Sequence, residues 1–224
     1  MKGLKRTGMT FLVVVLAIAF AATAFGQDYR SEARNVSGFT GVDIGGAMEA
    51  DITVGGAYEV IIEAKADVLP KIITEVRGDS LIVKHDKAWG EKMDWKNRGK
   101  VKVTVTLPTL NDLDISGATR AVVKGVNSDT IDIDVSGASS VVLDGSARTS
   151  MIDVSGASSI KAIGFTTDSA EIDASGASSI KLNVTSQLRA DASGASSVCY
   201  GGSPSVQKDT SGSSSVKGGC GVAQ

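Results

Sequence analysis

Histidine, cysteine, proline and aromatic residues are scarce in this chain of 224 residues. His85 is the single histidine, and aromatic side chains make up 4% of the sequence. One histidine and two cysteines offer little for a zinc site or a histidine-based catalytic triad. The 23 lysines and arginines are matched by 25 aspartates and glutamates, so the basic surplus typical of nucleic-acid binding is missing. The composition therefore disfavours enzymes and predicts no nucleic-acid partner.

The first 26 residues have the pattern of a secretory signal peptide. Lys2, Lys5 and Arg6 precede an apolar stretch over residues 9–24, which ends in small residues up to Gly26. This stretch is short for a membrane-spanning helix. We expect cleavage before Gln27, export to the cell surface, outer envelope or periplasm, and no spanning helix after cleavage. The alternative is a retained membrane anchor.

The only two cysteines, Cys199 and Cys220, lie near the C-terminus. Export to an oxidising compartment makes them a candidate disulfide. The alternative is a pair of reduced, partly buried thiols.

The second half of the chain is a repeat with a period of 18–20 residues. Six copies share an aspartate two residues before a Ser-Gly step, followed in most copies by Ala-Ser-Ser, and a degraded seventh copy begins at Asp43. The aspartates of the six copies are Asp114, Asp134, Asp153, Asp173, Asp191 and Asp209. The turn glycines are Gly117, Gly137, Gly156, Gly176, Gly194 and Gly212.

Each repeat reads as β-structure. Residues 131–136 alternate apolar and polar side chains with period two, Gly137 marks a turn, and residues 140–143 form a second short strand before a second turn at 144–146. Nearly identical turns at a fixed interval predict that each repeat completes one coil and stacks on the last, as in a parallel β-solenoid. Inward columns of small, β-branched residues would fill a narrow core, with Ile133, Ile152 and Ile172 in one column and Val141, Ile160, Ile180, Val198 and Val216 in another.

The mature chain, residues 27–224, is expected to form one domain. Residues 27–110 read as irregular N-terminal strands and residues 111–217 as the regular repeats. A polar loop over residues 86–99 carries both tryptophans, Trp89 and Trp95. They are candidates for an exposed binding loop, and the alternative is that they cover part of the apolar core.

Several of these motifs resemble one known family. They are the opening run of residues 35–44, the Leu69-Pro70 step, the alternating strand over residues 100–107 and the Ser-Gly-Ala-Ser-Ser repeats. Over residues 33–216 the chain is similar to the autotransporter adhesin head GIN domain family (DUF2807). The resemblance implies an all-β, right-handed parallel β-helix with tight turns at the Ser-Gly steps. It also implies a cell-envelope location, a role in adhesion and no catalytic residue.

The stacked aspartates are the most distinctive chemical feature of the repeats. Carboxylates ~5 Å apart along one edge repel each other, so a compensating interaction is needed. One interpretation is a turn-capping ladder, in which each Asp accepts backbone N–H groups of the following Ser-Gly step. The other is a column of Ca²⁺ ligands, although the nine-residue motif of Ca²⁺-binding solenoids is missing. Lys161 and Lys181 are expected to offset part of the charge.

The paired serines of each repeat form two further columns, one facing inward and one outward. The outward column is either a solvated turn edge or a regular hydroxyl face for a glycan or cell-surface ligand. We therefore expect a non-catalytic adhesion or binding module without a cofactor. The alternatives are a periplasmic structural or protein-docking envelope protein and, more remotely, a polysaccharide-active β-helix enzyme.

Overall fold

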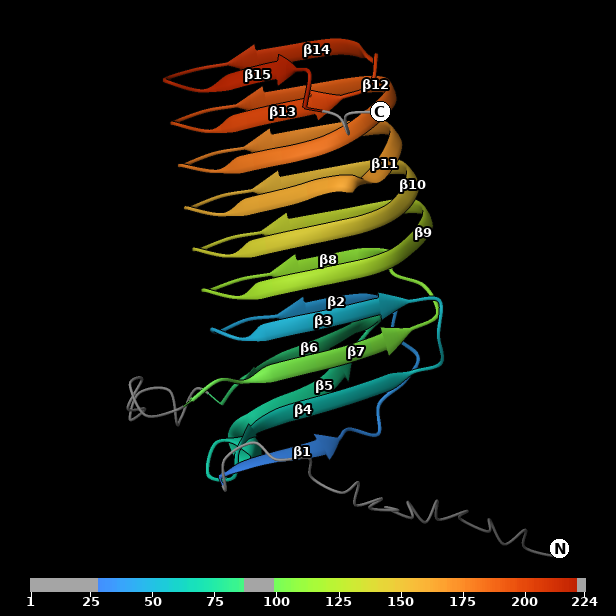
Figure 1. Cartoon of the computed structure of the whole chain (residues 1–224), viewed down its shortest axis with the longest axis vertical. Helices are drawn as coiled ribbons and strands as arrows, with labels where there is room; N and C mark the ends of the chain where they lie inside the picture. The colour runs from blue at the N-terminus through green and yellow to red at the C-terminus, as the bar shows by residue number, and fades with distance from the viewer. Residues whose placement is uncertain (1–27, 87–98, 221–224) are drawn as a thin grey trace, which may run out of the picture.

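The computed structural model describes residues 28–86 and 99–220 and confirms the predicted all-β, right-handed parallel β-solenoid (Figure 1). The N-terminal strands are β1 Tyr29–Ala33, β2 Gly41–Ile44, β3 Glu49–Val54, β4 Glu59–Lys65, β5 Ile72–Arg77, β6 Ser80–His85 and β7 Lys102–Leu107, with a 3-10 turn, η1, at Leu69–Lys71. The repeats form β8 Asp112–Ile115, β9 Arg120–Val135, β10 Ser140–Val154, β11 Ser159–Ala174, β12 Ser179–Ala192, β13 Ser197–Gly201, β14 Ser205–Thr210 and β15 Ser215–Gly218.

The regular coils are flattened into two sheet faces joined at two edges. In Figure 1 each of β9 to β12 crosses the front, bends over the right-hand edge and returns leftward behind. The Ser-Gly-Ala-Ser turn at the left-hand edge then starts the next coil. We call these faces the front sheet and the back sheet.

The core follows from the period-two alternation of the strands. Both predicted inward columns are buried, and Ile133, Ile152 and Ile172 are each 1% exposed. The inward serine column, Ser139, Ser158, Ser178 and Ser196, is also buried. A chain so poor in aromatic residues still closes a core because small and β-branched side chains fill the narrow space between the two sheets.

The second turn predicted at residues 144–146 is wrong. Residues 144–146 lie inside β10, where the register to β9 shifts between Leu143 and Gly145. This irregularity bends one continuous strand around the edge and does not reverse the chain, because the same strand continues into the back sheet.

The N-terminal region is less irregular than expected. Strand β2 pairs in parallel with both β6 and β8, and β3 pairs in parallel with both β7 and β9. Residues 41–54 therefore form a complete coil, placed between the β6–β7 layer and the first repeat. Antiparallel strands β1, β4 and β5 complete the lower end (Figure 1).

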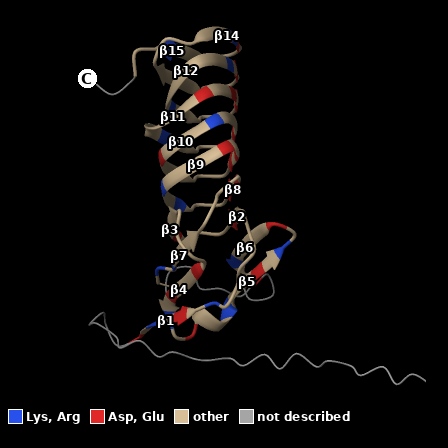
Figure 2. Cartoon of the chain, turned by 90° about the vertical axis from the view of Figure 1, so that its right-hand side faces the viewer, with Lys and Arg blue, Asp and Glu red and all other residues tan. Residues whose placement is uncertain are grey.

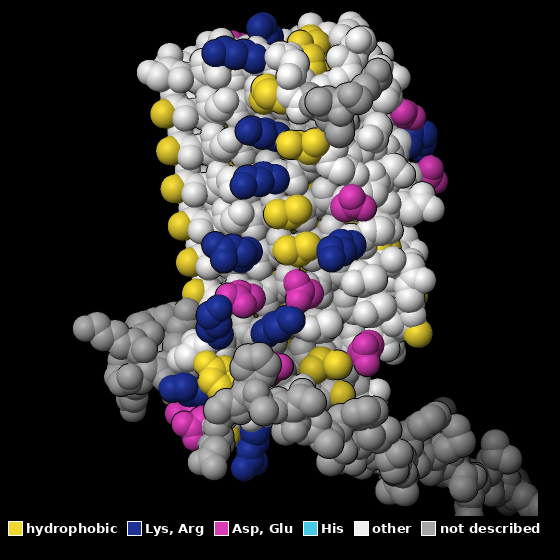
Figure 3. Space-filling model, viewed as in Figure 1, with side chains coloured by type: hydrophobic (Ala, Val, Ile, Leu, Met, Phe, Trp, Pro, Cys, Tyr) yellow, Lys and Arg dark blue, Asp and Glu magenta, His cyan; other side chains and the backbone are white. Residues whose placement is uncertain are grey.

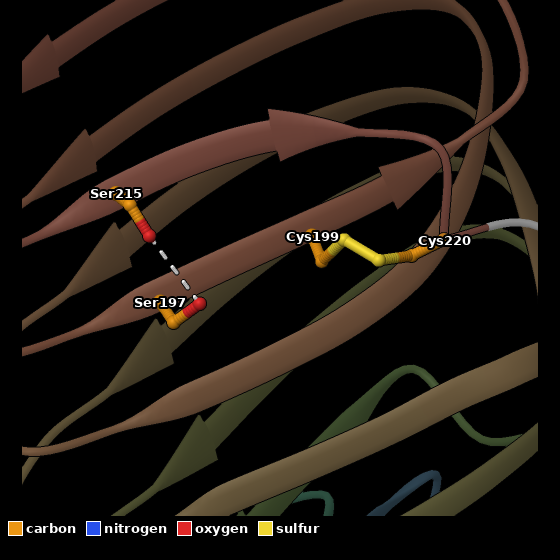
Figure 4. Close-up of a disulfide and its surroundings, with 4 residues drawn as sticks. All are labelled: Ser197, Cys199, Ser215 and Cys220. Atoms are coloured by element: carbon orange, nitrogen blue, oxygen red, sulfur yellow. Dashed lines mark hydrogen bonds between the residues drawn. A yellow bond between two sulfur atoms is a disulfide. The ribbon is translucent and has the colours of Figure 1, made fainter.

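The upper end is tied by the predicted disulfide. Cys199 on β13 is bonded to Cys220, which follows β15, with a Cα–Cα distance of 5.6 Å (Figure 4). The Cys220 N–H also donates to the Tyr200 carbonyl oxygen at 3.2 Å. The bridge holds the end of the chain against the preceding coil. Within residues 28–86 and 99–220, no helix is long and apolar enough to cross a membrane.

Candidate functional site

The repeat aspartates form one continuous column on the back sheet. Register pairs run from Asp43 to Asp114 and on through every repeat up to Asp191 and Asp209. Neighbouring members lie on adjacent strands, so their carboxylates are spaced by ~4.8 Å along the solenoid axis. We call this the aspartate column.

A long groove follows this column. It has a volume of about 500 Å³ and is lined by the aspartates from Asp114 to Asp209 and by the first serine of the turns, including Ser136, Ser155 and Ser175. Carboxylate and hydroxyl oxygens thus recur once per coil along one surface. Such a surface can contact an extended ligand at several equivalent points.

Burial and mutual repulsion change the acidity of the column at its lower end. Partial burial, followed by the charges of Asp43, Asp134 and Asp112, raises the pKa of Asp114 to about 6. Burial also raises the pKa of Asp43, although the charge of Lys84 opposes this shift. Burial and the neighbouring carboxylates likewise raise the pKa of Asp153. The ionised column therefore carries an electrostatic cost.

Among the described residues, the backbone N–H groups of the Ser-Gly turns donate to carbonyl oxygens of the neighbouring coil and not to the aspartates. The Ser155 N–H donates to the Val135 carbonyl oxygen (2.9 Å) and the Ala157 N–H to the Gly137 carbonyl oxygen (2.7 Å), both in the coil below. Across the described ranges, 28–86 and 99–220, no backbone N–H of these turns donates to an aspartate of the column. Turn-capping by the aspartates stays a prediction, without a hydrogen bond in its support.

The lysines expected to compensate the column lie on the opposite sheet, so this expectation is wrong. Lys161 and Lys181 are register partners on the first parts of β11 and β12, which belong to the front sheet. The Ser-Gly turn reverses the chain between each aspartate and the following lysine. In Figure 2 acidic residues lie along the back-sheet side of the regular coils, while the edge that faces the viewer carries residues of both signs.

The front sheet presents hydroxyl groups and lysines. The outward serine column is Ser140, Ser159, Ser179, Ser197 and Ser215, which are register partners. Ser159 Oγ donates to Ser140 Oγ at 3.3 Å, and Ser215 Oγ donates to Ser197 Oγ at 3.5 Å (Figure 4). The next outward column holds Lys161, Lys181 and Lys217. Figure 3 shows the basic side chains in a line on this face, with apolar side chains beside them.

The turn glycines stack at the edge between the two sheets. All six have a positive φ, from 71° to 80°. A Cβ on Gly194 would lie 2.6 Å from the carbonyl oxygen of Gly176 in the coil below. Glycine is therefore required both by the left-handed backbone and by the close stacking of turns.

Other sequence predictions have different outcomes. Two predictions lie outside the described residues: the candidate binding loop with Trp89 and Trp95, and the signal peptide at residues 1–26.

Sequence reasoning missed a second acidic pair, Asp112 and Asp132, which are register partners beside the aspartate column. The signal for this pair was the alternation of aspartate with an apolar residue over residues 112–114 and 132–134, which places both aspartates of a strand on the same face. In the described part of the chain, no group of three or more His, Cys, Asp or Glu side chains is arranged to hold a metal ion.

The chain belongs to the family described as "Putative auto-transporter adhesin, head GIN domain" (DUF2807), whose sequence model matches residues 38–204. The resemblance inferred from the repeat motifs is thereby confirmed. No curated protein matches the chain.

Solved structures share this fold. A putative adhesin from Bacteroides fragilis is 23% identical, with a TM-score of 0.70 over 86% of this chain and 98% of that one. A putative adhesin from Parabacteroides distasonis is 17% identical, with a TM-score of 0.52 over 86% of this chain and 98% of that one. At these identities the likeness concerns the fold alone. The family description names an adhesin.

Proposed function

We propose that this protein is an exported, non-catalytic β-solenoid that acts as a cell-surface adhesion or binding module. The observation that carries the proposal is the outward serine column of the front sheet, where hydroxyl groups repeat once per coil on a flat surface. A repeated array of weak contacts suits a repeated ligand, because the contacts act together when the ligand has a similar period. A glycan on a cell surface is such a ligand.

Two further features support this function. The first residues have the pattern of a signal peptide, which fits export. The family and the structural neighbours carry the description of adhesins. A periplasmic structural or protein-docking role would use the same surfaces, so the location of the mature protein separates the two.

Protease treatment of intact cells tests the location. If the solenoid is at the surface, an antibody against it will show cleavage on intact cells. A periplasmic marker that stays uncleaved serves as the control for envelope integrity. Protection of the solenoid until the cells are lysed would contradict the surface proposal and favour the periplasmic docking role.

A glycan-array experiment with the purified mature chain tests the binding surface. Ser159→Gln with Ser179→Gln places long side chains on the hydroxyl face, and we expect loss of binding. Ser155→Gln with Ser175→Gln is the matched control, because these serines line the groove of the back sheet. Equal binding by both variants and the parent chain would exclude the outward serine column as the contact surface.

A polysaccharide-active enzyme is the remote alternative. The groove supplies carboxyl groups, and Asp114, with a pKa of about 6, has an acidity suited to a general acid. The groove residues are aspartate, serine, valine and alanine, without an aromatic side chain for stacking a sugar. Release of reducing ends from a polysaccharide panel, lost in Asp114→Asn, would replace the binding proposal by this one.

A further inference from the structure

The two sheets of the solenoid have opposite charge and the same axial period. We define the lysine face as the outward surface of the front sheet around Lys161, Lys181 and Lys217. We define the aspartate face as the outward surface of the back sheet around the aspartate column. Both faces belong to the same stack of coils, so their register positions recur at the same ~4.8 Å interval. Lys161 and Lys181 lie on adjacent coils, whereas Cys199 occupies the position between Lys181 and Lys217.

Within the described residues, most of the charges that define the two faces form no ion pair. Among the residues that the structure describes, the three lysines of the lysine face form no ion pair. In the aspartate column, Asp191 is paired with Arg189 at 3.6 Å, whereas Asp153 and Asp173 have no cation within ion-pair distance in the same described ranges. Each face is therefore available for an opposite charge from outside.

Apolar side chains lie among these charges. Val142 is 40% exposed and is the register partner of Lys161. Ile163, two residues beyond Lys161, is 38% exposed. On the other face Met151 is 39% exposed and lies two residues before Asp153. Each face thus offers an apolar contact next to its charges, which an interface needs in addition to electrostatic complementarity.

The ends of the solenoid are poorly suited to contact with a second copy. Antiparallel strands occupy the lower end. At the upper end Lys208 takes an inward position, as register partner of the buried Ala190, and its Nζ donates to the Val216 carbonyl oxygen at 3.2 Å. An inward charge on the last coil opposes the addition of another coil, so the lateral faces are the surfaces left for association.

We propose that the lysine face of one copy binds the aspartate face of a second copy, so that the chain associates laterally with itself. The partner is thus a second copy of this chain. This inference deepens the proposed function and rests on it only in treating the solenoid faces as binding surfaces. Six coils of ~4.8 Å and strands about 17 Å wide give roughly 500 Å² per partner. The total of about 1,000 Å² is at the lower limit of specific interfaces, so the association is weak and sensitive to salt.

Sedimentation velocity of the mature, disulfide-bonded chain tests the proposal. At about 20 mM salt we expect the sedimentation coefficient to rise with protein concentration, and at about 500 mM salt the dimer dissociation constant to increase at least about tenfold. Lys161→Glu with Lys181→Glu, and separately Asp153→Lys with Asp173→Lys, should each weaken association at least about tenfold. An equimolar mixture of the two variants should associate again, because each retains one native face complementary to a native face of the other.

Matched controls carry the same change in net charge away from both faces. Arg30→Glu with Arg77→Glu is the control for the lysine variant, and Asp67→Lys with Asp129→Lys for the aspartate variant; these residues are exposed. Thermal melting checks that every variant is folded. A wild-type chain that stays monomeric up to about millimolar concentration at low salt would overturn the proposal, since even weak specific dimers form there.

Two other outcomes would also overturn it. Equal association of wild type and both face variants would place the contact elsewhere. Retention of a monomeric wild type, but not of the lysine-face variant, on sulfated dextran would replace the second copy by a polyanion. The protease experiment on intact cells is independent of self-association, so failure of this inference is distinguishable from failure of the proposed function.

Discussion

Asp114 on β8 lies beside Asp43 on β2 as its register partner, although the strands β3 to β7 come between them in the sequence. Asp134 on β9 is the register partner on the other side. Asp114 is thus a half-buried carboxylate with a carboxylate on each neighbouring strand. Burial and these charges raise its pKa to about 6.

This arrangement predicts that the protein becomes more stable on mild acidification. The folded-state pKa of Asp114 is about 6 and the unfolded value about 3.9, so the folded state binds the proton more tightly. Stability should therefore rise as the pH falls from about 7 towards 4, and change little from this group below the unfolded pKa. Melting temperatures at pH 7.5 and 4.5 measure the effect, with the higher value expected at pH 4.5.

Asp114→Asn should raise the melting temperature at pH 7.5 and reduce its dependence on pH, because the amide is neutral throughout. Asp144→Asn is the control, since Asp144 lies in the first part of β10 and outside the groove lining. A parent protein that loses stability steadily from pH 7.5 to 4.5 would contradict the prediction.

Substitutions of Asp153 test whether its carboxylate stabilises the turn by accepting hydrogen bonds or destabilises the fold by charge repulsion. If its carboxylate caps the turn, Asp153→Ala should cost about 0.5–2 kcal/mol, while Asp153→Asn should be nearly neutral. Because no turn N–H in the described part of the chain donates to the column, we expect instead that both variants are as stable as the parent or slightly more stable at pH 7.5. Urea denaturation gives the free energy of unfolding, and a loss confined to the alanine variant would establish capping.

Gly194 tests the stacking of the turns. Gly194→Ala should lower the free energy of unfolding by about 2–4 kcal/mol, because the backbone is left-handed (φ +71°) and the new Cβ would approach the Gly176 carbonyl oxygen. Gly38→Ala is the matched control, with φ +81° and no heavy atom within 4 Å of the added Cβ. It should cost only about 1–2 kcal/mol. Equal costs in urea denaturation would show that turn stacking contributes nothing.

The disulfide should stabilise the last coil selectively. It closes a sequence separation of 21 residues, which corresponds to about 3 kcal/mol in the chain-entropy account. In Cys199→Ser with Cys220→Ser, amide hydrogen exchange should become faster in β14 and β15 while β9 to β11 stay protected. Mass spectrometry of the two proteins measures this, and uniform acceleration over all coils would indicate that the bridge stabilises the whole solenoid.

Lys208 should keep the upper end of the solenoid from pairing with other strands. Lys208→Ile restores an apolar inward side chain at a position where β9 to β11 carry isoleucine, so we expect dimers or larger assemblies by light scattering. Lys208→Gln keeps the position polar and is the control. An isoleucine variant that remains monomeric at all concentrations would show that the inward lysine has no protective role.

Much of the fold was predictable from local pattern. Alternation over residues 131–136 and glycines at a fixed interval predict stacked strands, because a left-handed turn every 18–20 residues brings equivalent positions into register. The columns around Ile133 and Val141 followed from the same alternation. The turn predicted at residues 144–146 is a bend within one strand, because glycine suits both a chain reversal and a β-bulge, and only the strand pairing distinguishes the two.

The sequence by itself determined the coil, its inward columns and the alignment of the repeat aspartates. These depend on the period of the repeat, which is a local property. The sequence also offered Cys199 and Cys220 as a candidate disulfide, which the structure confirms. Tertiary structure alone decided that the coil of residues 41–54 lies between β6–β7 and the first repeat, because strand edges select partners irrespective of chain order. It also decided that Lys161 and Asp153 face opposite ways and that Lys208 takes an inward register position at the exposed upper end. The sheet to which a side chain belongs depends on where the chain turns. Whether an inward position is covered depends on which coil is the last of the stack.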